Sequence, residues 1–544
     1  MEARRSAVPV HVVPWQNGRV VRWLAATNHK QVGILTVLTS LVFLLLAVAY
    51  GLVMQAQLTV AGNDVVSRDG FAALVTMHGV TMLFLVVLPA VLGLATYLTP
   101  LLIGARDMAL PRVTALSYWL YLFAGVLITA TWLSTGSAPK ASFASLVPLS
   151  QGEFSKGQAQ TILGLALILL AVAWLLWAVN TLATVVARRA EGMTWCRLPV
   201  FAWSATVAAA VLLVTTPVLG VATAFLVLDR EAGTHLLTAS GSARTYDHLF
   251  WFFAQPAIGV MAILAAGIAS EVIPVFSRRA IATRTPLIVA IAGSGLLSIV
   301  SYGRHLTATG QSSSAESVFM IAALALVVVS AFAVAVWVAT LWGGRPRLTT
   351  ALLFSVGFIV LFSVGVLASL FLAAFPVSWQ LAGTAFESAQ LAYLVQGGVL
   401  LAVFAGLFYW WPKMFGRVLD ERLGKLQYLL MFVGFNTAFI PQFMLGALGL
   451  PGGVATYTNP DWEGYQLCSL VGAGILAAGI LVFAFNAVRT LLAGTRVGGD
   501  PWSGDTLEWF AESPPVPQNF ATLPPIESAC PVRDARRRLK AAGG

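Results

Sequence analysis

Long apolar runs separated by short polar segments repeat along the whole chain. About 20 helical residues cross the hydrocarbon core of a bilayer, and these runs reach that length. Backbone groups in lipid need partners within their own segment, so runs this long suit helices better than barrel strands. The pattern predicts an all-α polytopic membrane protein with twelve transmembrane helices, at about residues 31–56, 71–104, 113–134, 159–187, 198–228, 248–276, 285–303, 316–342, 349–374, 384–411, 427–449 and 465–493.

The composition supports this class of protein. Hydrophobic residues make up 58% of the 544 residues and charged residues only 10%, too little charge to cover a soluble domain of this length. The three cysteines, Cys196, Cys468 and Cys530, form no C-x-x-C pair, which argues against a disulfide framework, a thiolate zinc site or an iron–sulfur cluster. The first thirty residues are polar and basic and precede an apolar run of spanning length, so we expect no cleavable signal peptide.

The net charge of +10 is explained by where the basic residues lie. With twelve helices, 26 of the 32 Lys and Arg lie in the two tails and in the loops on the same side, and six lie on the opposite side. The positive-inside rule then makes both termini cytoplasmic. This arrangement accounts for the charge without a nucleic-acid partner.

No linker divides the chain into separate folding units. We expect a cytoplasmic N-terminal tail at residues 1–30, a membrane domain at 31–493 and a cytoplasmic C-terminal tail at 494–544. The last tail is rich in proline and ends in Arg536-Arg537-Arg538-Leu539-Lys540. We interpret it as a solvated extended segment with a basic end near anionic headgroups.

Several short motifs occur in one order along the chain. They are Thr27-Asn28-His29-Lys30, Met77-His78-Gly79, Pro100 to Arg112, Asp247 to Gly259, Trp410-Trp411-Pro412-Lys413-Met414-Phe415-Gly416, Asn436 with Pro441-Gln442, and Asp500-Pro501-Trp502 with Leu507-Glu508-Trp509. Together with twelve helices, this set resembles subunit I of the haem–copper terminal oxidases, of the bacterial cytochrome c oxidase type, over residues 20–526. The resemblance implies a respiratory complex in the bacterial cytoplasmic membrane, with subunit II- or III-like partners in the lipid bilayer.

The resemblance also implies a low-spin haem held by two histidines, a high-spin haem held by one and a copper held by three. His78 stands at the first low-spin haem position, as a residual haem ligand or as a packed histidine. The family's His-x-His pair in the tenth helix falls at Gln390 and Ala392. Alanine cannot ligate iron, and an amide is a poor substitute for imidazole.

The implied copper site is altered in the same way. The family's His-Pro-Glu-x-Tyr motif falls at Gln255 to Gly259, so Gln255, Ala257 and Gly259 replace the imidazole, the proton-relaying carboxylate and the phenol. The family's His-His pair falls at Arg304 and His305. A guanidinium stays charged and cannot bind a metal cation, which leaves His305 as a weak candidate for a haem ligand.

Positions implied in proton transfer and haem binding outside the metal sites differ too. Ala333 replaces the lysine of one proton route, Gln55 replaces an arginine directed at a haem substituent, and Gly452-Gly453 replaces the Arg-Arg pair at the haem propionates. Asp107 keeps the mouth of the other proton route, so it is a candidate for proton entry. The alternative is that Asp107 belongs to a packed, capped turn.

Two charged residues stand in apolar helices where ligands are missing. A charge at the bilayer centre costs about 2.5–3.5 kcal/mol, so such residues need a partner or a role. We predict a buried ion pair of Arg304 with Glu387, or with Glu316. The alternative is that Arg304 extends to water at the outer surface.

The residues leave open whether the chain is an enzyme. The leading hypothesis is a degenerate, non-catalytic structural or assembly subunit, a pseudoenzyme, that binds no cofactor, or at most one haem, and no copper. A second hypothesis is catalytic subunit I of a proton-pumping cytochrome c or quinol oxidase that reduces oxygen to water with unorthodox haem ligation. A third is a conduit for protons or small molecules that uses Asp107, Arg304 and Glu387.

Overall fold

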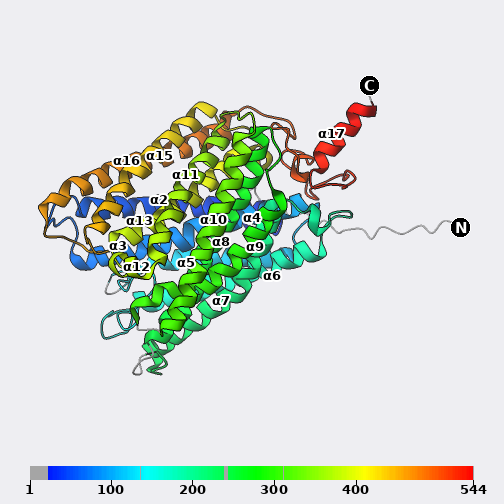
Figure 1. Cartoon of the computed structure of the whole chain (residues 1–544). Coiled ribbons are helices and arrows are strands. Elements are labelled where there is room, and N and C mark those ends of the chain that lie inside the picture. Colours follow the sequence, from blue (N-terminus) through cyan, green and yellow to red (C-terminus); the bar gives the residue numbers. More distant parts are fainter. Residues whose placement is uncertain (1–22, 135–136, 238–242, 310–311, 543–544) are drawn as a thin grey trace.

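The computed structural model describes residues 23–134, 137–237, 243–309 and 312–542. Within these ranges the chain is helical and contains no β-strand, only two isolated bridges. The long helices pack side by side into one bundle, and α17 (Pro531–Ala542) lies at one end of it (Figure 1). The predicted all-α fold is therefore confirmed for the described part of the chain.

Twelve helical segments in the described residues are long and apolar enough to cross a membrane, as predicted. Several of these segments combine two or three helices. The helices are α2 (His29–Gln57), α3 (Arg68–Val80), η1 (Thr81–Val87), α4 (Leu88–Ile103), α5 (Pro111–Ala130), η2 (Thr131–Leu133), α6 (Ala159–Ala187), η3 (Trp195–Arg197), α7 (Val200–Ala232), α8 (Ala243–Ser277), α9 (Arg284–Val300), η4 (Ser301–Thr309), α10 (Ser313–Trp342), α11 (Thr350–Ala373), α12 (Phe375–Leu381), α13 (Ala385–Leu391), η5 (Ala392–Val399), α14 (Leu400–Phe415), α15 (Glu421–Ala447), η6 (Pro460–Trp462), α16 (Glu463–Ala493), η7 (Leu507–Trp509) and α17.

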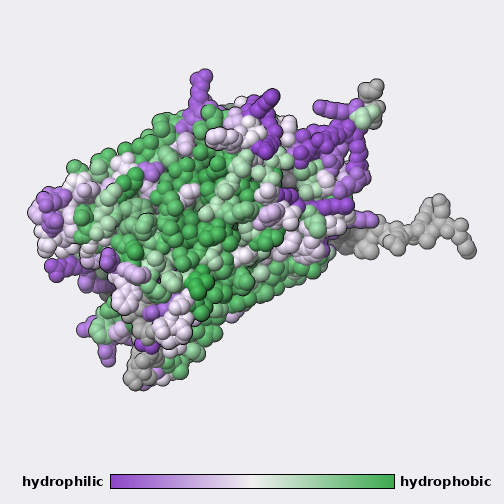
Figure 2. Space-filling model, viewed as in Figure 1, coloured by the Kyte–Doolittle hydropathy of each residue, from purple (hydrophilic) through white to green (hydrophobic). Residues whose placement is uncertain are grey.

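The surface has the polarity of a membrane protein. Figure 2 shows a broad hydrophobic band on the visible face, with hydrophilic residues gathered at its two ends. Helices contribute unequally to this surface: the span Arg68–Ile103 is 94% buried, whereas α10 is only 17% buried. The first therefore forms the centre of the bundle, and α10 presents most of its apolar side chains outward.

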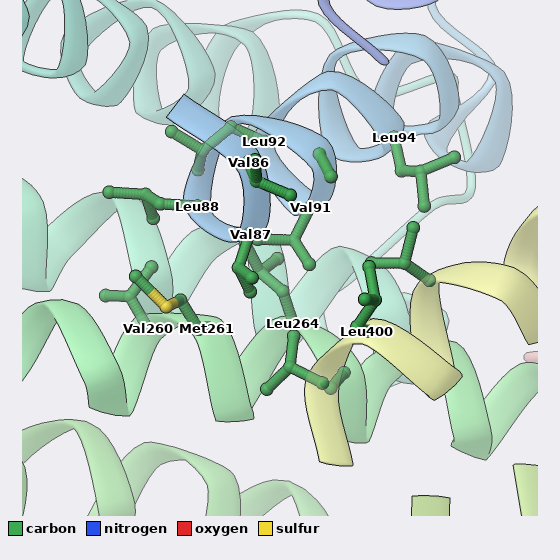
Figure 3. Packing of buried hydrophobic residues seen from close by; sticks show 14 of the residues in the cluster. Val86, Val87, Leu88, Val91, Leu92, Leu94, Val260, Met261, Leu264 and Leu400 are labelled. Atoms are coloured by element: carbon green, nitrogen blue, oxygen red, sulfur yellow. The ribbon is translucent and has the colours of Figure 1, made fainter. Parts of the chain in front are cut away.

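The centre of the bundle is a close packing of aliphatic side chains. Val87 at the end of η1 points toward Leu264 of α8, and Leu88 at the start of α4 and Leu400 of α14 belong to the same cluster (Figure 3). All four are less than 5% exposed. Lipid is as apolar as these side chains, so dispersion contacts and close fit, more than exclusion of water, hold such helices together.

Two of the central spans contain a π-helical turn. In one, η1 begins at Thr81, three residues after His78, and in the other η5 begins at Ala392, two residues after Gln390. The two π segments contact each other. A π turn displaces the side chains that follow it around the helix axis and is common near functional sites. The sequence pattern did not predict either turn.

The C-terminal tail differs from the prediction of a solvated segment. Leu507, Glu508 and Trp509 are at most 2% exposed, and Asn519 is fully buried. Asn519 Oδ1 accepts a hydrogen bond from Lys30 Nζ at 2.5 Å, and its side chain also pairs with the imidazole of His29. The tail is packed because polar side chains at the start of α2 have their partners in it. The boundary at residue 494 stays a prediction.

Lys413 attaches the tail to the end of α14. Its Nζ donates to the backbone oxygens of Gly499 at 2.8 Å, Ala511 at 2.6 Å and Glu512 at 3.2 Å. It also lies 5.2 Å from the centre of the Trp509 ring, within the range of a cation–π contact. One buried ammonium thus holds two separate stretches of the tail.

We predict that Lys413→Met destabilises the protein by about 3 kcal/mol, because the three carbonyl oxygens lose a charged donor. Unfolding in detergent would measure this loss, and trypsin should cleave the tail faster in the variant. Lys425→Met removes an exposed ammonium and is the matched control. Equal stability of the two variants would contradict the role assigned to Lys413.

A second prediction concerns Glu508, whose Oε1 accepts from Thr506 Oγ1 at 2.7 Å and from Trp410 Nε1 at 3.3 Å. Its Oε2 has no partner among the described residues. Burial, with the Glu271 carboxyl nearby, raises the pKa of Glu508 from 4.5 to about 8. The folded protein therefore binds this proton more tightly than the unfolded chain does.

The stabilising contribution of this proton is complete below pH 4.5 and is lost as the pH rises to about 8. We expect stability to fall over this window by at most about 1.4 kcal/mol per pH unit from this group. Glu508→Gln should flatten this part of the profile in thermal unfolding. Glu527→Gln, at an exposed carboxyl, should leave the profile unchanged, and a profile that is the same in E508Q and wild type would refute the assignment.

Candidate functional site

A cavity of about 730 Å³ lies inside the bundle. Most of its wall is apolar. Nine of the site residues singled out in the sequence line it: His78, Gln255, Gly259, Arg304, His305, Ala333, Glu387, Gln390 and Ala392. Gln55, Gly452 and Gly453 line it as well. The structure therefore brings together residues from distant parts of the chain that the sequence linked only through the resemblance.

Ala257 and Asp107 lie outside the cavity wall. Ala257 is buried in the main apolar core. Asp107 Oδ1 accepts hydrogen bonds from the backbone N–H of Met108 at 2.8 Å and of His29 at 3.2 Å. Burial raises the pKa of Asp107 above its ordinary value. Its position is that of a packed turn that joins two segments, and a role in proton entry stays a proposal.

His78 presents one nitrogen to the cavity. Its Nδ1 lies 2.9 Å from the carbonyl oxygen of Ala47, and because a carbonyl only accepts, Nδ1 carries the proton. Nε2 then keeps its lone pair and has no hydrogen-bond partner among the described residues. Gly51 leaves room beside the ring, since a Cβ there would lie 3.3 Å from His78 Cε1. A ring fixed through Nδ1 with a free Nε2 is the usual arrangement of a metal-binding histidine.

His305 is held on both sides. Its Nε2 lies 2.9 Å from Gln255 Oε1, and its Nδ1 lies 3.5 Å from Glu387 Oε1. The ring stacks on Trp251 with centroids 3.7 Å apart and planes at 9°. Whichever way the Gln255 amide is turned, both ring nitrogens are engaged. His305 therefore has no lone pair free for a metal in this arrangement.

Trp251 was not predicted as a site residue. Residues four apart lie on the same face of a helix, and Trp251, Gln255 and Gly259 have that spacing on α8. All three line the cavity. This spacing was a signal in the sequence that pointed to Trp251, but its contact with His305 required the position of η4.

The predicted contact between Arg304 and Glu387 differs in the structure. Glu387 Oε1 faces His305, and Glu387 Oε2 accepts from the backbone N–H of Gly383 at 2.9 Å. Among the described residues, no carboxylate lies within 4.0 Å of the Arg304 guanidinium, that of Glu316 included. The reason is that the histidine next in sequence reaches Glu387 first. Arg304 lines the cavity instead.

Gln390 and Ala392 occupy the two candidate ligand positions of the tenth span. Gln390 is 1% exposed, and its Nε2 donates to Ser369 Oγ at 2.7 Å. Ala392 is buried at the first position of η5. Neither side chain offers a nitrogen to a metal, in agreement with the chemistry expected of an amide and a methyl group.

The chain is similar to known proteins over most of its length. A model of the family described as cytochrome C and quinol oxidase polypeptide I matches residues 31–475. Cytochrome c oxidase subunit 1 of Bacillus subtilis is 35% identical over 514 residues, which is 94% of this chain and 82% of that protein. The putative cytochrome c oxidase subunit 1-beta of Streptomyces coelicolor is 36% identical over 519 residues, 95% of this chain and 90% of that protein.

Two further likenesses bear on cofactors and fold. The heme-copper oxidase subunit I+III of Aeropyrum pernix is 34% identical over 508 residues, 93% of this chain and 62% of that protein. A solved structure of a heme-copper terminal oxidase dimer has a TM-score of 0.76 and 17% identity, and covers 86% of this chain and 85% of that one. At this identity the structural likeness supports the fold alone.

These likenesses contradict one prediction, that the chain binds no cofactor, or at most one haem, and no copper. The Aeropyrum pernix relative is named as a heme-copper oxidase subunit, and the family match spans most of the chain, so the family points to haem as a cofactor. The prediction rested on the ligand positions alone. The structure adds a cavity of about 730 Å³ and, on its wall, His78 with a free nitrogen.

The cavity residues fit a haem at His78. The volume of about 730 Å³ lies within the range of about 300–1,000 Å³ that is typical of ligand pockets, and the wall is mainly apolar. No group of three His, Cys, Asp or Glu side chains in the described ranges is placed to hold a metal ion, so these residues do not by themselves assemble a copper site.

Gly259 generates a prediction about the cavity wall. A Cβ at this position would lie 2.6 Å from Ser298 Cβ, so α8 and α9 are in contact through the missing side chain. We expect Gly259→Ala to destabilise the protein by about 1–3 kcal/mol in detergent unfolding, because the helices must separate.

Ser298→Gly in the same chain should restore most of this loss. Gly293→Ala is the control, since a Cβ there meets no atom within 4 Å. If G259A were as stable as G293A, the close approach of α8 and α9 at this position would be refuted.

Proposed function

The chain belongs to the cytochrome c and quinol oxidase polypeptide I family, and on that premise we propose that it is a haem-binding, non-catalytic subunit of a respiratory membrane complex. The observation that carries the proposal is the state of the two cavity histidines. His78 has a free nitrogen, whereas His305 is engaged by Gln255, Glu387 and Trp251. This arrangement supports binding of a haem at His78.

The proposed roles of the residues follow from these contacts. Haem, when bound, supplies one-electron transfer. His78 Nε2 would ligate it, and the Ala47 carbonyl would keep the imidazole in the required tautomer. The apolar wall would exclude water. Gln255 and Glu387 hold the neighbouring imidazole against Trp251 and prevent it from turning toward the ligand.

The proposal includes the surroundings of the protein. The chain is a membrane protein whose described residues include twelve helices apolar and long enough to span a bilayer, and the Bacillus subtilis and Streptomyces coelicolor relatives are named as oxidase subunits. We place it in the cytoplasmic membrane with both termini in the cytoplasm, on the basis of the Lys and Arg asymmetry. Subunit II- or III-like proteins are the proposed partners, and the Aeropyrum pernix relative, named as subunit I+III, supports the second kind.

The test is haem analysis of the purified protein. We expect a pyridine–haemochrome signal from wild type and its loss in His78→Ala, because the variant has no free imidazole nitrogen at the cavity. His248→Ala is the matched control: His248 lies outside the cavity wall and bonds to Tyr302, so its loss should leave the haem content unchanged.

Oxygen uptake tests the non-catalytic part of the proposal. Neither reduced cytochrome c nor a quinol should drive oxygen consumption above the level of His78→Ala. Oxygen reduction that survives purification and depends on this chain would overturn the proposal in favour of a catalytic subunit. Absence of haem from well-folded wild type would overturn its haem-binding part.

A further inference from the structure

Arg304 forms no direct ion pair on the wall of an apolar cavity, although the Glu387 carboxylate is near enough to attract its charge. It belongs to η4, within a span of membrane character. Among the described residues its guanidinium has no carboxylate within 4.0 Å and donates no hydrogen bond. Its five N–H donors are therefore open to whatever the cavity contains.

The neighbouring carboxylate is already in use. Glu387 Oε1 faces His305 and Oε2 accepts from Gly383 N, so this side chain is oriented away from a direct contact with the guanidinium. A charge at membrane depth costs about 2.5–3.5 kcal/mol even on the most lenient scale. An anion that enters the apolar space beside Arg304 would offset part of this cost, so the cavity favours an anionic ligand.

The wall of the cavity favours an anionic group that is attached to a large apolar molecule. A small hydrated anion would gain little from the apolar wall formed by residues such as Leu52, Phe71 and Phe439. A carboxylate suits the planar guanidinium, which can bind both of its oxygens.

We propose that the cavity binds an apolar ligand that carries a carboxylate, and that Arg304 is the residue that binds this carboxylate. A haem propionate and a fatty acid share this chemistry. If the ligand is haem, the inference rests on the proposed function, in which His78 ligates the haem. If the ligand is a fatty acid, the inference is independent of that function.

The experiment compares each acid with its ester. Haem-free protein, produced without haem supply and purified in detergent, is titrated with haemin and with haemin dimethyl ester and followed by absorbance. Wild type should bind the acid roughly 10-fold to 100-fold more tightly than the ester, as expected for a charged hydrogen-bonded pair. Arg304→Met should bring the ratio close to one, and Arg304→Lys should retain part of it.

A second arm uses oleate and methyl oleate, with the unfolding temperature as readout. It identifies a fatty acid as the source if oleate stabilises wild type more than its ester and Arg304→Met removes the difference. Unfolding of the ligand-free variants also controls for folding. Arg304→Met should be at least as stable as wild type, because an unpaired charge is removed; a large loss of stability would show that Arg304 has a structural partner and would overturn the inference.

The outcomes separate the two proposals. Haem that binds through His78 with equal preference for acid and ester, in a protein that does not respond to oleate, would overturn the role of Arg304 and leave the proposed function standing. Oleate binding that depends on Arg304, in a protein that takes no haem, would support this inference and overturn the haem-binding function. An acid preference in both arms that survives in Arg304→Met would also overturn the inference.

Discussion

Every polar group inside a lipid-embedded bundle has to find its partner within the protein, and this requirement governs the structure of the cavity. Gln390 bonds to Ser369, Glu387 bonds to His305 and Gly383, and Lys413 bonds to three carbonyl oxygens of the tail. Water is not available at this depth to satisfy a group that lacks a partner, and an unmet donor or acceptor costs several kcal/mol. Of the positions that the family resemblance assigns to metal ligands, Gln255 and His305 bond to each other and Gln390 bonds to Ser369, whereas the Arg304 guanidinium and His78 Nε2 have no partner among the described residues.

The cavity itself is maintained by the packing of the helices around it. Its walls belong to helices that touch elsewhere through small residues: a Cβ on Gly434 would lie 2.5 Å from the backbone of Leu476, and a Cβ on Gly472 would lie 2.2 Å from that of Ala438. These contacts fix the spacing between α15 and α16 whatever the cavity contains. A change of side chain on the cavity wall, as at Gln390 or Ala392, therefore does not require the cavity to close.

The sequence predicted the spans well and the contacts between them less well. Twelve apolar runs are a local property of the chain, so their number and approximate positions follow from composition and length. The partner of Glu387 does not, because His305 lies about eighty residues earlier and Arg304 is its immediate neighbour; only the path of η4 decides which one reaches the carboxylate. The π turns and the burial of the tail were not predicted either, because they too depend on contacts between segments distant in sequence. The proline-rich composition of the tail predicts a solvated segment. Only the structure shows that Lys413 binds it.

Overall identity and local chemistry carry different information about this protein. The identity near 35% extends over most of the chain, and the scaffold of this protein depends on residues such as His29, Lys413 and Asn519, whose bonds join segments hundreds of residues apart. A family match weighs these positions together with the few on the cavity wall, and it responds little when the latter change. The charge at residue 304 shows the consequence. A guanidinium on the wall changes the electrostatics of the cavity, so the ligand preference of this protein depends on its own wall residues.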